Sequence, residues 1–140
     1  MGRGWKIGAI LIVVWLFLLL AGFWAKPNGR GAFAKYICVP VPASVGNIAF
    51  DGNDWFGIAP EPVCYFWFSI GSNDVSKVVA AKAYKSVKSD DMFSPGGPVW
   101  FRPPLSGTNG QFYRNRGRRG TEYLWIDSTG TNGYFLLFGV

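Results

Sequence analysis

The chain has 140 residues and a formal net charge of +6, from 14 Lys and Arg, 8 Asp and Glu and no His. Without His it cannot form a Ser-His-Asp triad or an H-E-x-x-H zinc site, and it also lacks the glycine-rich phosphate loop and the calcium-loop motif. These observations exclude several large classes of enzyme. We expect neither a cofactor nor a bound metal.

Most of the net charge lies beside one apolar segment near the N-terminus. Four basic residues near this segment contribute +4: Arg3, Lys6, Lys26 and Arg30. Residues 35–140 carry 10 basic and 8 acidic side chains, which leaves only +2. This balance is ordinary for a protein surface, so we predict no nucleic-acid partner.

The apolar segment occupies residues 7–25 and contains no charged residue. As a helix, these 19 residues would be roughly 28 Å long, close to the hydrocarbon thickness of a bilayer. Trp5 and Trp24 lie at its two ends, where amphipathic rings prefer the level of the lipid headgroups. We therefore predict a short tail at residues 1–6, then an uncleaved transmembrane helix, a signal anchor, with the lipid bilayer as its partner.

The alternative is a signal peptide that is cut away. Residues 32–34, Ala-Phe-Ala, have the small-x-small form of a cleavage site, and cleavage there would release a secreted soluble domain. The site lies well beyond the apolar segment, past Pro27 and Arg30, which favours the anchor. An N-terminal segment of this kind normally directs the rest of the chain across the membrane, so we place the domain outside the cytoplasm, either periplasmic or extracellular.

Residues 26–35 contain Pro and Gly and show no apolar period, which predicts a short tether. Residues 36–140 then form one extracytoplasmic domain. Its first element is predicted as a strand at residues 36–42, placed at a sheet edge because Pro40 and Pro42 cannot donate hydrogen bonds to a neighbour.

The chain has two cysteines, Cys38 and Cys64, and each falls in a predicted strand. An extracytoplasmic location would permit a disulfide bond between them, which would stabilise the fold by roughly 3 to 4 kcal/mol. Two separately buried thiols are the alternative, and the sequence leaves both open.

The middle of the domain predicts two strands and one helix. Residues 46–52 form a short strand, and residues 63–70 form a strand that is apolar on both faces and therefore central. From Ser72 the apolar period becomes helical, and Asp74 lies in the first turn. We predict an amphipathic helix at about residues 73–85.

The last part of the chain predicts a meander of three strands, at residues 111–114, 121–127 and 134–140, joined by glycine-containing turns. Together the elements predict an α+β protein. An N-terminal transmembrane helix precedes a small domain with one antiparallel β-sheet of about five to six strands and one amphipathic helix.

One acidic and aromatic cluster is a candidate site for carbohydrate chemistry. Its members are Asp51, Asp54, Trp55 and Glu61. Paired carboxylates beside an aromatic platform are typical of sugar-cleaving enzymes. Such residues are also common in polar turns, where Asp accepts hydrogen bonds from nearby amides, so we expect no catalytic residue here.

Two further segments are candidate interaction surfaces. One is the Pro- and Gly-rich loop at residues 94–110, whose aromatic side chains either pack on the sheet or form an exposed patch. The other is the basic run at residues 114–119, around the turn that follows the strand at 111–114, which could bind anionic lipid or an acidic protein. The candidate residues are Trp100, Phe101, Arg102, Arg114, Arg116, Arg118 and Arg119.

The sequence thus predicts a membrane-anchored envelope protein with a non-catalytic interaction or accessory domain, whose partner is another membrane or envelope protein. Two alternatives stay open at this point. One is an enzyme that acts on envelope carbohydrate through its Asp and Glu residues, and the other is a secreted soluble domain released by signal cleavage.

Overall fold

The computed structural model of the protein describes residues 3–24, 28–54, 59–88, 96–104 and 109–139. Three α-helices lie in this part of the chain: α1 (Arg3–Trp24), α2 (Gly29–Tyr36) and α3 (Ser72–Ala80). The strands are β1 (Gly46–Gly52), β2 (Val63–Ser69), β3 (Lys85–Ser86), β4 (Gln111–Gly117), β5 (Gly120–Ile126) and β6 (Asn132–Phe138).

These strands form one antiparallel sheet in the order β1-β2-β6-β5-β4-β3. The predicted α+β domain with a single antiparallel sheet is therefore confirmed. The predicted strands at residues 46–52 and 63–70 and the C-terminal meander are all present, within a few residues at each end.

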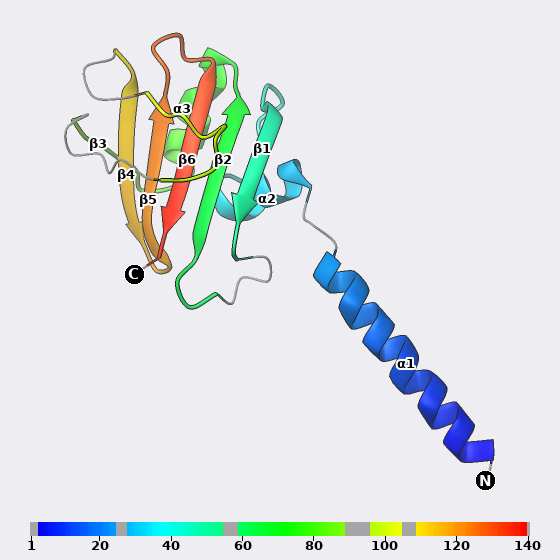
Figure 1. Ribbon diagram of the computed structural model, residues 1–140. Helices are drawn as coiled ribbons and strands as arrows, with labels where there is room; N and C mark the ends of the chain where they lie inside the picture. The colour runs from blue at the N-terminus through cyan, green and yellow to red at the C-terminus, as the bar shows by residue number, and fades with distance from the viewer. Residues whose placement is uncertain (1–2, 25–27, 55–58, 89–95, 105–108, 140) are drawn as a thin grey trace.

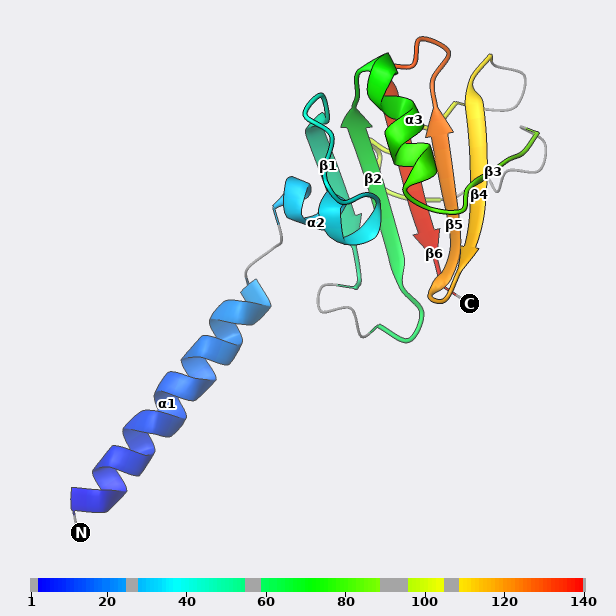
Figure 2. The same cartoon turned by 180° about the vertical axis from the view of Figure 1, so that it is seen from behind.

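The sheet has two unlike faces, because side chains alternate along each strand. Helices α2 and α3 cover one face (Figure 2), where β2 contributes Cys64, Phe66 and Phe68 to the larger core cluster. The other face is crossed by residues 96–104 (Figure 1), and Phe101 in that segment packs against Trp125 and Leu136. We call these the helix face and the loop face.

Helix α2 replaces two predicted features, the tether at residues 26–35 and the edge strand at residues 36–42. The tether prediction is wrong from Asn28 onwards, because Asn28 caps a helix, accepting a hydrogen bond from the Gly31 amide at 2.6 Å. The strand prediction is wrong because this helix ends at Tyr36 and residues 37–42 form no strand. Ala32, Phe33 and Tyr36 are buried on the sheet. The folded domain therefore includes residues that the Pro and Gly content assigned to a linker.

Helix α3 is shorter than the predicted helix at residues 73–85. It ends at Ala80, where the Ala81 amide donates to the carbonyls of Lys77 and Val78, and Lys85 and Ser86 then pair with β4. Pairing with the sheet edge thus ends the helix, although the Ala- and Lys-rich sequence favours its continuation.

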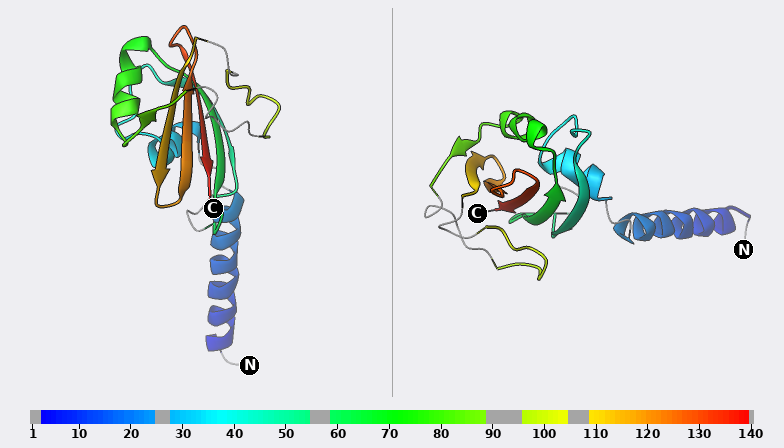
Figure 3. Two further views of the ribbon diagram at one scale, coloured as in Figure 1. Left: turned by 90° about the vertical axis from the view of Figure 1, so that its left-hand side faces the viewer. Right: turned by 90° about the horizontal axis from the view of Figure 1, so that it is seen from above.

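Helix α1 extends away from the sheet (Figure 3). Every side chain from Ile10 to Leu20 is apolar, and each is between 49% and 71% exposed. Within the described residues, no helix combines the length and the hydrophobicity that crossing a membrane requires.

Candidate anion-binding surface

The β4–β5 hairpin places two of the predicted arginines side by side on the loop face. The register pairs Arg114 with Tyr123 and Arg116 with Thr121. The strands continue to Gly117 and from Gly120, so the predicted long turn shortens to two residues, Arg118 and Arg119. Arg116 is therefore held on a strand together with Arg114, and not in a turn.

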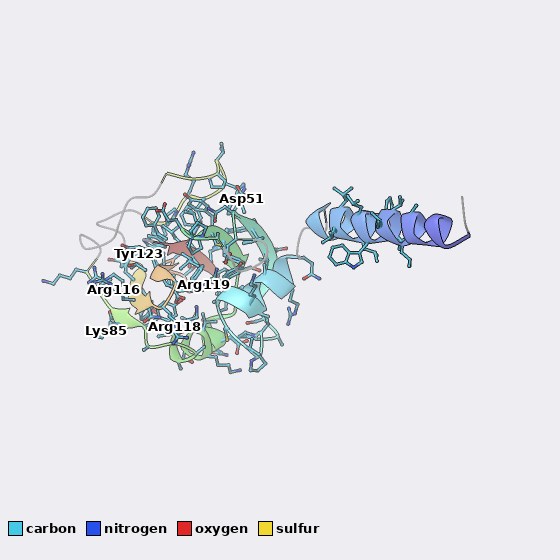
Figure 4. All side chains as sticks on the ribbon, turned by 90° about the horizontal axis from the view of Figure 1, so that it is seen from below. Asp51, Lys85, Arg116, Arg118, Arg119 and Tyr123 are labelled. Carbon is cyan, nitrogen blue, oxygen red and sulfur yellow. The ribbon has the colours of Figure 1, made fainter. Side chains whose placement is uncertain are left out.

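Strand β3 adds a third basic side chain to this part of the sheet. Lys85 pairs with Arg114 across the antiparallel ladder, so both point to the same face. A hollow of about 560 Å³ lies here, and its lining includes Lys85, Ser86, Arg114, Arg116, Thr121 and Tyr123. Seen from the end of the sheet where the β4–β5 turn lies, Lys85, Arg116 and Tyr123 gather on one side of the domain (Figure 4). We call this the basic hollow.

The charged side chains that line the basic hollow are all positive. Its lining contains no Asp or Glu, and within the described ranges Lys85, Arg114 and Arg116 form no ion pair. The nearest acid along β5, Glu122, points to the helix face, where it accepts from Lys82 at 2.6 Å. Three cationic side chains thus converge around a space that a negatively charged group could fill.

Arg119 belongs to a different environment from its neighbours in the basic run. Its guanidinium forms an ion pair with Asp54, whose side chain is fully buried. The Asp54 carboxylate also accepts hydrogen bonds from the Ala59 amide and from the Tyr36 hydroxyl, each at 3.0 Å. Arg119 therefore joins the hairpin to the loop after β1 and to α2, and its charge is paired with that of Asp54.

We call Asp54, Arg119 and Tyr36 the Asp54 cluster. The protonation state of each member follows from its neighbours. Burial by itself would raise the pKa of Asp54, but the hydrogen bonds from Ala59, Arg119 and Tyr36 and the charge of Arg119 together hold the pKa below its usual value. Burial and the neighbouring Cys64 and Asp54 raise the pKa of Tyr36. At neutral pH the cluster therefore holds a carboxylate, a guanidinium and a neutral phenol.

The two cysteines are both buried and both have free thiols. Burial, followed by the negative charge of Asp54, raises the pKa of Cys64 to about 11. A thiol with so high a pKa is largely protonated at neutral pH, and Cys64 acts as an apolar residue beneath the Asp54 cluster.

The acidic and aromatic cluster predicted from the sequence is divided in the structure. Asp54 is buried in the ion pair, whereas Asp51 and Glu61 are exposed. Trp55 lies outside the described residues. Asp54 is therefore committed to holding the hairpin, and its carboxylate faces Arg119 instead of solvent.

The candidate residues of the aromatic loop also lie in different environments. Phe101 is buried, with its ring 5.1 Å from that of Tyr65 and 6.0 Å from those of Trp125 and Tyr134. Trp100 is 38% exposed and Arg102 is exposed. The packing interpretation of this loop therefore holds for Phe101, while Trp100 and Arg102 remain at the surface.

Sequence reasoning missed Lys85, Thr121 and Tyr123 as members of the candidate site. The sequence pattern places Lys85 in a helix, and only its pairing with β4 brings it beside Arg114. For Thr121 and Tyr123 the signal is present, because a two-residue turn between Gly117 and Gly120 fixes which residues face each other across the hairpin.

Among the described residues, no three His, Cys, Asp or Glu side chains gather closely enough to hold a metal ion. Comparison of the chain with protein families, with curated proteins and with solved structures found no match.

Proposed function

We propose that the protein is a single-pass, membrane-anchored binding domain that lies outside the cytoplasm and holds an acidic partner in its basic hollow. The observation that carries the proposal is the exposure of the apolar side chains from Ile10 to Leu20. A helix that is apolar all round is stable only where protein or lipid covers it. Lipid around residues 7–25 would provide that cover.

The position of Phe33 supports an anchor that is kept in the mature protein. Cleavage after Ala34 would remove Phe33, which is fully buried with its ring 4.9 Å from that of Phe68. Loss of a buried Phe costs about 3 to 5 kcal/mol in typical cores. Release of the domain at this site would therefore remove part of its own core.

A binding role is favoured over carbohydrate chemistry by the state of Asp54. Its carboxylate is buried and bound by Arg119, Tyr36 and the Ala59 amide, so it does not face the solvent from which a sugar would approach. The basic hollow, in contrast, has donors and cations that no described acid neutralises. An acidic ligand or partner would complete it.

The anchor is tested by expressing the full-length protein, washing the membranes with carbonate and measuring the intact mass of the retained species. We expect the protein in the washed membranes, with a mass that includes residues 6–26. A soluble species that begins near Lys35 would contradict the anchor and would indicate a secreted domain.

A pair of variants makes this test more specific. Val14→Lys with Leu16→Lys places two charges in the middle of the apolar segment, each costing roughly 2.5 to 3.5 kcal/mol in a bilayer. We expect this double variant to leave the membrane fraction. The control, Val39→Lys with Val99→Lys, adds the same charges at two exposed positions of the domain and should leave the protein in the membranes.

A further inference from the structure

We propose that the basic hollow binds the phosphate group of an anionic lipid headgroup, in the leaflet from which α1 would emerge. This inference rests on the proposed function, because it names the acidic partner of the same site. The hollow is lined by the side chains of Lys85, Arg114 and Arg116 and by Thr121, which pairs with Arg116 across the hairpin.

The lining has the chemistry that phosphate requires. A guanidinium presents paired N–H groups that match two phosphate oxygens, and an ammonium adds a compact charge. Thr121, which pairs with Arg116 and faces the same side of the sheet, supplies a neutral hydroxyl donor in the same lining. With three cations and no carboxylate, the hollow favours an anion over a neutral or zwitterionic group.

The volume of the hollow favours a ligand that is larger than a free inorganic anion. Its roughly 560 Å³ lies in the range of sites that take small organic molecules, so a phosphate leaves room for the rest of a headgroup. Tyr123 lines the same space and provides an amphipathic ring, a type of side chain that favours the membrane interface.

The chain also keeps the folded domain that carries the hollow next to the proposed bilayer. From Trp24 at the end of α1 to Gly29 at the start of α2 there are five peptide steps, which span at most about 18 Å. The β4–β5 turn, with exposed Arg118, lies at the end of the sheet from which α1 extends (Figures 1 and 3). Arg118 is thus placed to add attraction to an anionic surface around the hollow.

The test uses the full-length protein in a neutral detergent and native mass spectrometry to count the lipids retained. Dioleoyl phosphatidylglycerol is the anionic probe, and dioleoyl phosphatidylcholine is the zwitterionic comparison. The site variant is Arg114→Gln with Arg116→Gln. The matched control, Lys77→Gln with Arg102→Gln, removes the same charge from two exposed positions outside the hollow lining.

We expect the wild-type protein and the control to retain phosphatidylglycerol in preference to phosphatidylcholine. The site variant should bind phosphatidylglycerol about 10- to 30-fold more weakly, since each basic residue near an anionic surface contributes roughly a fivefold factor or somewhat less. Equal retention by the site variant would overturn the proposal, because the lipid would then be held elsewhere, for instance around α1.

Two competitors separate lipid from other sources of negative charge. Inorganic phosphate that binds as tightly as phosphatidylglycerol would overturn the lipid assignment in favour of a free anion. Polyglutamate that displaces phosphatidylglycerol at lower concentration would overturn it in favour of an acidic protein. Displacement by neither competitor supports the headgroup.

The failure of this proposal is distinguishable from failure of the anchor. Binding in detergent does not depend on where the protein lies in a cell, so a carbonate-extractable protein could still retain phosphatidylglycerol. Conversely, a protein that stays in washed membranes but shows no lipid preference would keep the anchor and lose the headgroup site.

Discussion

The β4–β5 hairpin carries four arginines within six residues, and its two ends use them differently. At the turn, Arg119 points to the helix face and pairs with the buried Asp54. Along β4, Arg114 and Arg116 face a hollow that contains no acid. A basic run therefore has no single role, because strand register decides which charge is structural and which is left for a ligand.

The largest effect on stability is expected when the ion pair at the turn is removed. Arg119→Gln would leave the Asp54 carboxylate buried without its counter-charge, so we expect the free energy of unfolding to fall by about 2 to 4 kcal/mol at neutral pH. The measurement is urea unfolding of the full-length protein in neutral detergent, followed by near-UV circular dichroism.

Its matched control is the neighbouring residue. Arg118 is exposed in the same turn, and Arg118→Gln should change the free energy of unfolding by no more than about 0.5 kcal/mol. Equal losses in the two variants would show that the ion pair with Asp54 does not stabilise the domain.

The same pair predicts how stability depends on pH. Since the folded-state pKa of Asp54 lies below its ordinary value of 3.8, its contribution is present above that value and is lost as the pH falls through the folded-state pKa. In Arg119→Gln, burial without the guanidinium should raise the pKa of Asp54, so protonation then favours folding. The stability difference between wild type and variant should therefore shrink below about pH 4.

Urea unfolding at pH 7 and pH 3 would measure this difference. Asp74 and Asp127 also have lowered pKa values, but both are present in both proteins, so their contributions cancel. A difference that stays constant with pH would show that Arg119 does not control the ionisation of Asp54.

A smaller loss of stability is expected when the Tyr36 hydroxyl is removed. Tyr36→Phe removes the hydroxyl that donates to the Asp54 carboxylate at 3.0 Å and to the Asp54 backbone carbonyl. The ring can keep its packing, so we expect a loss of about 1 to 2 kcal/mol in the same unfolding measurement. An unchanged unfolding midpoint would mean that the hydroxyl adds nothing to the Asp54 cluster.

The smallest effect on stability is expected when the arginines of the basic hollow are replaced. Arg114→Gln with Arg116→Gln removes two like charges that lie near each other and near Lys85, so stability should stay within about 0.5 kcal/mol of wild type. Thermal unfolding monitored by circular dichroism would check this. A large loss would assign these arginines to the fold and would remove the reason for placing a ligand in the basic hollow.

Much of the sheet could be predicted from the sequence, because alternation on β2 and the Gly-containing turns of the meander are local signals. Gly133 illustrates the limit, since its sequence neighbours favour a turn. In the structure it lies in β6 beneath the Phe68 ring, where a Cβ atom would collide with the ring. That requirement comes from a partner distant in the sequence.

The candidate site was predictable only in part for the same reason. The basic run is visible in the sequence, but the ion pair between Arg119 and Asp54 joins residues 65 positions apart. Helix α2 was missed because its Asn28 cap and its buried Phe33 lie among Pro and Gly residues. Local composition indicated a linker, and burial against the sheet determined a helix.

The early start of α2 has a consequence for binding strength. With so few residues between α1 and the folded domain, anchoring would keep the domain beside the bilayer and the hollow within about one domain width of the headgroups. Tethering of this kind raises the effective concentration of a second site into the millimolar range. A headgroup site on this domain would therefore not need high intrinsic affinity, and weak, rapidly exchanging lipid contacts would suffice to set the orientation of the domain on the membrane.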